Sequence, residues 1–152
     1  MINQISHIMK AKVISVAEDL FMRLGVRSIT MDEVARTLSM SKKTLYQCFE
    51  NKVQLVSATV IAHIEREEDA FKRIHEASGN AIEEIHGLAE IMRKNLGQLN
   101  PSTEFDIQRF HSHAWETFLD FKDKCIQGHT ADNIVRGVNE GYYRPEIDAN
   151  IM

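Results

Sequence analysis

Proline and glycine are scarce in this chain of 152 residues, which contains two prolines and seven glycines. Both residue types interrupt regular secondary structure, so their scarcity leaves room for long helices. The alternation of apolar and polar residues that marks a half-buried strand does not extend over a segment of useful length. Apolar residues recur instead at helical spacing. We therefore predict an all-α protein.

Cysteines and long apolar runs are also few. Cys48 and Cys125 are far apart and belong to no CxxC or Cys/His ligand pattern, so we expect no disulfide framework. The first residues lack the apolar core of a signal peptide, and no run approaches the roughly 18 apolar residues of a membrane span. These absences predict a cytoplasmic protein with no membrane partner.

Charge is unevenly distributed along the chain, whose net charge is −4. Residues 1–56 contain eight lysines and arginines against five acidic residues, a net charge of +3. The remainder contains ten basic and 17 acidic residues, a net charge of −7. A basic first third on an acidic body is typical of a small head that binds a polyanion.

Helix-capping signals divide the basic third into short pieces. A first helix is expected over residues 6–24, and Gly25 ends it. Thr30 precedes Glu33 by three residues, which is the spacing of a capping box. This pair predicts the start of a short second helix over residues 31–38.

Two further caps follow within about 22 residues of the first. Ser41 is expected to cap a short third helix over residues 42–49, and Asn51, with Gln54 completing a second capping box, a long fourth helix over residues 52–77. Short helices are marginal alone, so the second and third must dock on their neighbours. Two short helices joined by a turn of about three residues make a helix-turn-helix.

The acidic body is expected to contain four more helices. Asn80 with Glu83 predicts the start of the first of them, and Pro101 suits the first turn of the second. The expected ranges are 81–99, 102–111, 112–127 and 132–139. One apolar stripe on the first of these helices consists of Ile82, Ile85, Leu88, Ala89, Met92 and Leu96.

The segment from Ala17 to Val56, AEDLFMRLGVRSITMDEVARTLSMSKKTLYQCFENKVQLV, resembles the TetR family of bacterial transcriptional regulators. The match combines a first helix ended by glycine, a threonine-capped short helix, the motif S-x-x-T-L-Y-x-x-F and a lysine after the turn. The resemblance implies a three-helix helix-turn-helix DNA-binding head, residues 1–54. A long fourth helix would join it to a helical ligand-binding and dimerisation body, residues 55–152.

Beyond Val56 the resemblance is architectural. The stretch GYYRPEID, residues 141–148, is similar to the connector that precedes the last two helices of the family. Those two helices usually build the dimer interface, and we expect this sequence to lack them. The resemblance implies a homodimer for the full-length protein.

The expected recognition helix, residues 42–49, turns Leu45 and Phe49 inward. Its N-terminal part would enter the major groove, where Thr44 can contact a thymine methyl and Gln47 can pair with adenine. Tyr46 and Lys52, like their counterparts in the family, are expected to bind phosphate. The predicted DNA-binding residues are Thr30, Ser41, Lys42, Lys43, Thr44, Tyr46, Gln47 and Lys52. The alternative is that the lysines only solubilise the surface and Tyr46 packs half-buried in the core.

Aromatic residues gather in the body, over residues 105–121. In TetR-like proteins the corresponding region often encloses an inducer pocket, which here would suit a hydrophobic or amphipathic small molecule. The predicted ligand-binding residues are Met92, Leu96, Phe110, His111, Trp115 and Phe118. Plain core packing of the same side chains is the alternative.

Signals for other chemistry are weak. His111 and His113 lie two apart, so in a helix they point about 200° apart and do not hold one metal ion together. No nucleophile elbow, phosphate loop or dinucleotide fingerprint occurs. We therefore predict no cofactor, no metal and no enzymatic activity.

The sequence thus predicts a ligand-responsive repressor that binds double-stranded operator DNA. The resemblance implies a dimer on a near-palindromic operator, released by a small-molecule inducer. The alternative left open is a helical sensor or adaptor that acts through a protein partner without binding DNA.

Overall fold

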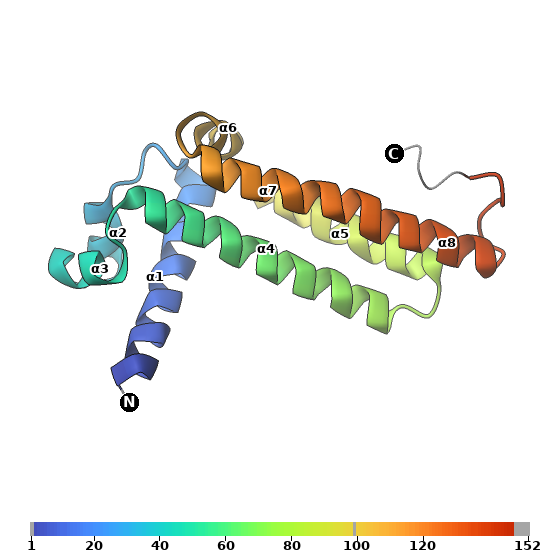
Figure 1. Cartoon of the computed structure of the whole chain (residues 1–152), viewed down its shortest axis with the longest axis horizontal. Helices are drawn as coiled ribbons and strands as arrows, with labels where there is room; N and C mark the ends of the chain where they lie inside the picture. The colour runs from blue at the N-terminus through green and yellow to red at the C-terminus, as the bar shows by residue number, and fades with distance from the viewer. Residues whose placement is uncertain (1, 99, 148–152) are drawn as a thin grey trace. The chain divides into compact units, whose positions relative to one another are not determined.

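The computed structural model describes residues 2–98 and 100–147, apart from the side chains of residues 2–6, 96, 98, 126 and 127. Within these ranges the chain is helical and contains no strand, which confirms the all-α prediction (Figure 1). The helices are α1 (Ile2–Leu24), α2 (Met31–Thr37), α3 (Lys42–Cys48), α4 (Lys52–Ala77), α5 (Ala81–Gln98), α6 (Pro101–Phe110), α7 (Ser112–Cys125), the π-helix η1 (Ile126–Thr130) and α8 (Ala131–Asn139). None of the helices in the described ranges is long and apolar enough to cross a membrane.

The chain forms two compact units. The head unit comprises Met1–His63 and Gln98–Thr117, and the body unit comprises Ile64–Gly97 and Phe118–Met152. Residues 98–117, which include α6, therefore belong with the helix-turn-helix although they lie far from it in the sequence. The predicted division into a DNA-binding domain up to residue 54 and a ligand-binding domain from residue 55 concerns function and stays a prediction.

The head unit has one apolar core. α1 contributes Val13, Ala17 and Phe21 at helical spacing, and all three side chains are buried. The short helices add Val34 from α2 and Leu45 from α3, each at most 1% exposed. Helices of seven residues do not persist alone. Their burial against α1 and against each other is what holds α2 and α3 in place.

Side-chain caps define the helix starts as the sequence predicts. In the capping box, the Glu33 N–H donates to Thr30 Oγ1 at 3.2 Å, and the Thr30 N–H donates to Glu33 Oε2 at 2.6 Å. Asn51 accepts from the Gln54 N–H at 2.9 Å. The Gln54 side chain, however, reaches one residue further back and accepts from the Glu50 N–H at 2.8 Å.

Several helix boundaries differ from the prediction. α1 begins at Ile2 and not at residue 6, because no residue of that segment breaks a helix. The seventh helix was expected to run to residue 127, but α7 ends at Cys125 and η1 follows. A single turn with i→i+5 bonding leaves no periodic signal in five residues. The expected end of the fifth helix at residue 99 lies outside the described residues.

The body unit is joined at one end by a network of charged groups. The Arg136 guanidinium donates to Glu84 at 2.9 Å, to Glu140 at 2.7 Å and to the Ser78 carbonyl at 2.9 Å. Glu140 in turn accepts from the Ala81 N–H at 2.7 Å, which satisfies an N–H at the start of α5. Glu84 is 2% exposed, so its pairing with Arg136 offsets the cost of burying a carboxylate.

The apolar stripe predicted on α5 is only partly buried. Leu88 is 6% exposed, whereas Ile82, Ile85 and Met92 are 46%, 38% and 52% exposed. The buried side of α5 also contains Glu84, because the Arg136 pair makes a carboxylate acceptable there. Hydrophobicity alone therefore does not identify the inner face of this helix.

Gly25 provides a test of the head packing. Its φ of +84° is unfavourable for other residues, and a Cβ there would lie 2.6 Å from Ser102 Oγ. We expect Gly25→Ala to lower the free energy of unfolding by about 1–2 kcal/mol from the left-handed backbone alone. Gly97→Ala in α5 is the control, since its Cβ meets no described atom within 4 Å and should stabilise by roughly 0.5–1 kcal/mol. Urea denaturation of both variants checks the opposite signs.

Candidate nucleic-acid interface

The turn between α2 and α3 is closed by backbone hydrogen bonds. The Met40 N–H donates to the Ala35 carbonyl and the Ser39 N–H to the Arg36 carbonyl, both at 3.0 Å. This is the Schellman pattern, and Ser39 takes the left-handed position with a φ of +52°. The turn fixes α3 relative to α2, so the two helices present one continuous surface.

Three of the predicted DNA-contact residues on α3 have exposed side chains. Lys43, Tyr46 and Gln47 lie on the outer side of the helix, opposite the buried Leu45. Within the described part of the chain, no hydrogen bond or ion pair engages their side chains. Tyr46 is 48% exposed, so its ring is available at the surface. The structure thus brings these three side chains together on one exposed face.

Ser41 and Thr44 share a hydrogen bond at the start of α3. Ser41 Oγ accepts from the Thr44 N–H at 3.1 Å, and the two hydroxyl oxygens lie 2.8 Å apart. One hydroxyl must donate to the other, whichever it is. The pair therefore offers only one free hydroxyl hydrogen to a partner at any moment.

Lys42 and Thr30 are engaged within the head. Lys42 Nζ lies 2.5 Å from Asp32 Oδ2, in a pair whose side chains are 66% and 56% exposed. The Thr30 hydroxyl donates to Glu33 Oε2 at 2.8 Å and accepts from the Glu33 N–H. Both residues lie at the surface, but neither side chain is unpaired.

Lys52 is half-buried at the first turn of α4. Burial lowers the pKa of its ammonium group, while the charges of Asp106 and Glu33 act in the opposite direction. Nearby, His111 is 9% exposed, and its Nδ1 has no hydrogen-bond partner among the described residues. Burial and the Lys52 charge lower the His111 pKa, against the opposing effect of Asp106.

The N-terminal half of α6 is hydrogen-bonded to the end of α1. The Thr103 hydroxyl donates to the Phe21 carbonyl at 2.7 Å, and the Asn100 N–H donates to the Met22 carbonyl at 2.7 Å. Asp106 accepts from the Arg27 N–H at 2.8 Å, in the loop that leads to α2. The last carbonyls of a helix lack partners within it, and here Asn100, the N-cap of α6, supplies one to Met22, while Thr103 adds a second donor to the Phe21 carbonyl beside the Gly25 N–H. The position of α6 is thereby tied to the entrance of the helix-turn-helix.

Comparisons with known proteins agree with this geometry. Residues 13–59 match the family model of bacterial regulatory proteins of the tetR family. The chain is 20% identical over 147 residues to the HTH-type transcriptional repressor KstR2 of Mycobacterium tuberculosis, covering 94% of this chain and 73% of that protein. It is 31% identical over 91 residues to the uncharacterised HTH-type transcriptional regulator YvaF of Bacillus subtilis, covering 59% and 48% of the two chains.

Residues 13–59 carry the DNA-binding segment of the TetR family. This match and the regulators similar in sequence support a DNA-binding transcriptional regulator of a ligand-responsive kind. The solved structure of KstR2 matches with a TM-score of 0.67 at 19% identity over 94% of this chain and 74% of that one. A TetR/AcrR regulator from Thermobifida fusca matches with a TM-score of 0.70 at 18% identity over 94% and 76%. These structures share the fold.

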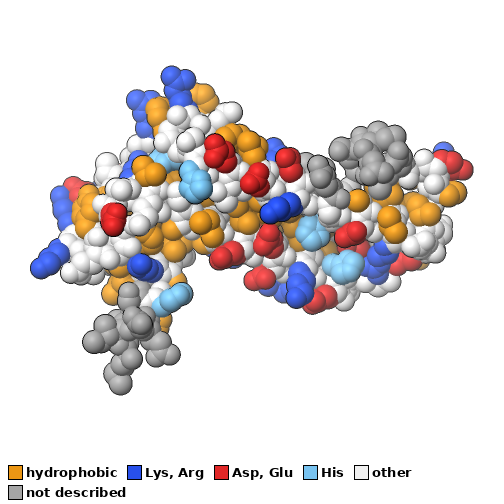
Figure 2. All heavy atoms as spheres, in the orientation of Figure 1, with side chains coloured by type: hydrophobic (Ala, Val, Ile, Leu, Met, Phe, Trp, Pro, Cys, Tyr) orange, Lys and Arg blue, Asp and Glu red, His pale blue; other side chains and the backbone are white. Residues whose placement is uncertain are grey.

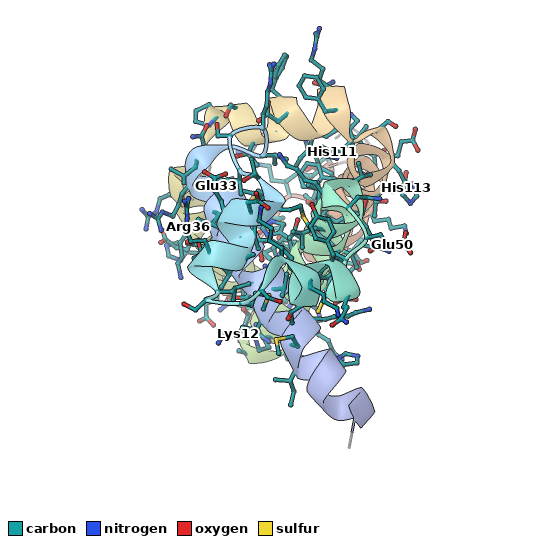
Figure 3. All side chains as sticks on the ribbon, turned by 90° about the vertical axis from the view of Figure 1, so that its left-hand side faces the viewer. Lys12, Glu33, Arg36, Glu50, His111 and His113 are labelled. Carbon is teal, nitrogen blue, oxygen red and sulfur yellow. The ribbon has the colours of Figure 1, made fainter. Side chains whose placement is uncertain are left out.

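Arg36 is a further candidate contact of this head and was not among the residues predicted from the sequence. Its side chain is 79% exposed on α2, and Figure 3 shows it at the outer edge of the head. The signal was available, because Val34 and Ala35 face the core and place residue 36 on the opposite side. On the face in Figure 2, lysines and arginines lie at the edge of the head, and acidic side chains lie over the body unit together with further lysines and arginines.

The six predicted ligand-binding residues belong to both units and, where their side chains are described, differ in exposure. Phe110 is 48% exposed, with the Arg27 guanidinium 5.4 Å from its ring, so it is not enclosed as expected. His111 is buried, Trp115 and Phe118 are half-buried, and Met92 is exposed. The side chain of Leu96 lies outside the described residues. Their role in ligand binding stays a prediction.

The polar residues of the body unit include none of those predicted to bind DNA. An open depression in the body unit is lined by His75, Glu76, Ser78, Asp132, Val135, Arg136, Asn139 and Glu140. Among the residues that the structure describes, no group of three or more His, Cys, Asp and Glu side chains is arranged to hold a metal ion. Cys125 is half-buried, and burial followed by the Glu68 and Glu67 charges raises its thiol pKa to about 11.

Thr103 provides a test of the hydrogen bonds between α6 and α1. Thr103→Val keeps the volume but removes the donor to the Phe21 carbonyl. We expect the free energy of unfolding to fall by about 0.5–1.5 kcal/mol, the net contribution of one hydrogen bond, because the Phe21 carbonyl keeps the Gly25 N–H at 3.0 Å as a second donor. Thr103→Ser keeps the donor and serves as the control. Equal stabilities of the two variants in urea denaturation would show that this hydrogen bond contributes little.

Because the pKa of His111 is lowered in the folded protein, we expect the free energy of unfolding to depend on pH. Its pKa is lowered on folding, so the unfolded chain binds more protons than the folded one below the ordinary histidine value of about 6.5. Stability is therefore retained above that pH and lost as the pH falls below it. We expect His111→Gln to reduce the loss of stability between about pH 7 and pH 5, measured by urea denaturation relative to the unsubstituted chain. An unchanged pH profile would contradict this role.

Proposed function

We propose that this protein is a TetR-family repressor that binds a near-palindromic operator as a homodimer and is released by a small-molecule inducer. The observation that supports the DNA-reading role most directly is the exposed group of Lys43, Tyr46 and Gln47 on α3. They project from a helix whose start and turn are fixed by hydrogen bonds. A rigid, exposed set of donors and acceptors is what recognition of base edges requires.

The side chains of α3 have distinct expected roles. Gln47 suits adenine, to which it can bond through N6 and N7, and Lys43 suits guanine or phosphate. Tyr46 suits a phosphate oxygen, which positions the protein without reading sequence. The Ser41–Thr44 pair contributes one hydroxyl donor. These roles follow from insertion of the N-terminal part of α3 into the major groove.

Phosphate contacts are expected around the rim of α3. Arg36 on α2 adds an exposed guanidinium to those assigned from sequence. Lys52 lies at the start of α4, where the helix dipole also favours an anion. Because Lys52 is half-buried, it would bind a phosphate that approaches that helix end closely. Thr30 would first have to release Glu33 to donate its hydroxyl.

Inducer control is supported by the hydrogen bonds between α6 and the α1 end. A ligand that displaces α6 would disturb the partners of Phe21, Met22 and Arg27 at the entrance of the helix-turn-helix. Only a ligand with different affinities for the two conformations shifts their populations. His111 Nδ1 is buried and has no hydrogen-bond partner among the described residues, so it suits the polar anchor of a hydrophobic or amphipathic inducer. KstR2 carries the description ketosteroid transcriptional regulator, and an inducer of similarly apolar character fits this proposal.

Action through a protein partner is the second candidate. Phe105 and Phe110 are 55% and 48% exposed, and Arg109 lies within 5.9 Å of both rings. Exposed aromatic and arginine side chains are enriched where proteins bind one another. This surface supports an adaptor or sensor role if the protein proves not to bind DNA.

Selection from random duplex DNA tests the proposal. We expect an enriched inverted repeat whose half-site centres lie about 10 base pairs apart or a multiple of that distance. Lys43→Ala and Tyr46→Ala should each weaken binding of that site, by about 1–3 kcal/mol if the residue reads a base. A residue that binds only phosphate should instead reduce the slope of log affinity on log salt by about 1.

Lys94→Ala is the matched control, because it removes an exposed lysine from α5 in the body unit. It should leave the selected motif and its affinity unchanged. A single half-site would retain DNA reading without a dimer. If a folded, dimeric protein enriches no motif, the DNA-binding proposal is wrong and the protein-partner candidate takes its place.

A further inference from the structure

An ion pair joins the first residue of the recognition helix to α2. Lys42 Nζ and Asp32 Oδ2 are 2.5 Å apart and belong to residues ten positions apart in the chain. We propose that Asp32 is a specificity-determining residue, which holds Lys42 so that it discriminates operator from random DNA. This inference rests on the proposed function, because it concerns how the same surface selects its DNA.

The backbone positions of Asp32 and Lys42 are both fixed by capped helix starts. Asp32 lies in the first turn of α2, whose start is held by the Thr30–Glu33 capping box. Lys42 is the first residue of α3, whose start is held by Ser41. A carboxylate in a first helical turn is also favoured by the helix dipole. The Asp32 charge therefore has two stabilising interactions at this place, and Lys42 provides one of them.

Random DNA gains its affinity from lysine and arginine side chains that neutralise phosphates. A phosphate that approaches Lys42 meets a neutralised ammonium group and the adjacent carboxylate of Asp32. It must either separate the pair or bind elsewhere. Asp32 therefore reduces the contribution of Lys42 to binding that ignores sequence.

A base edge can bond to Lys42 without separating it from Asp32. An ammonium group has three N–H donors, and a bond to Asp32 occupies one of them. The remaining donors can reach a neutral acceptor such as guanine O6 or N7 without separating the pair. Lys42 is thus more useful to an operator with an acceptor at the right place than to a random phosphate. Specificity of this kind comes from weakening the wrong complex.

The head contains a matched ion pair on α1, outside the helix-turn-helix. Asp19 and Arg23 of α1 are 3.1 Å apart, with side chains 60% and 63% exposed. Asp32→Asn and Asp19→Asn each remove one negative charge from an exposed pair in the same unit. A comparison of the two variants separates the local effect on Lys42 from the change in net charge.

The experiment measures affinity for the selected inverted-repeat duplex and for a shuffled duplex of equal length, over a range of salt concentrations. We expect Asp32→Asn to bind the shuffled duplex about two- to fivefold more tightly, the range that an exposed ion pair allows. The slope of log affinity on log salt should steepen by up to about 0.9, the value for one added phosphate contact. Affinity for the selected duplex should rise less, so the ratio of the two affinities falls.

The control variants decide the mechanism. Asp19→Asn should change both affinities by a common, smaller factor. In a Lys42→Ala background, Asp32→Asn should have no more effect than Asp19→Asn. Circular dichroism of each variant verifies that the head remains folded.

Three results would overturn the inference. Equal effects of Asp32→Asn and Asp19→Asn would show that Asp32 acts only through net charge. A full effect of Asp32→Asn without Lys42 would assign it to direct repulsion of phosphate. Failure of the unsubstituted protein to bind any duplex at low salt would refute DNA binding itself. The first two results would refute only the role of Asp32, so the failure of this inference can be told from the failure of the proposed function.

Discussion

The ends of the helices impose the constraint on which this head depends, because backbone groups there have no partner within their own helix. The starts of α2, α3 and α4 find acceptors locally, in the side chains of Thr30, Ser41 and Asn51. The end of α1 has one local donor, the Gly25 N–H, and gains further donors from Asn100 and Thr103, about 80 residues away in the chain. One physical requirement thus shapes the reading surface and also ties a distant helix to it.

The same hydrogen bonds divide the polar residues of the head into two groups. Thr30 and Lys42 are occupied by Glu33 and Asp32, so their availability depends on breaking an existing interaction. The side chains of Lys43, Tyr46 and Gln47 on the outer side of α3 have no hydrogen bond or ion pair among the described residues. A basic helix-turn-helix is therefore not a uniform positive surface. Its acidic residues pair with some of its cations, as Asp32 pairs with Lys42.

Burial of polar groups in the head is concentrated where α6 meets the start of α4. Asp106 is 6% exposed and accepts the Arg27 N–H, while His111 is 9% exposed and leaves one ring nitrogen without a partner among the described residues. An unsatisfied buried polar atom costs stability and requires a reason. Burial and the Lys52 charge lower the His111 pKa, so this region favours the neutral imidazole.

The sequence by itself determined the all-α class, the capped short helices and the outer side of α3, because these depend on contacts within three or four residues. It did not determine that residues 98–117 join the head, that Lys42 pairs with Asp32, or that Phe110 is exposed. Those features depend on contacts between segments far apart in the chain or on separate helices. Local periodicity identifies a helix and its apolar residues, but only the tertiary structure decides what each side chain meets.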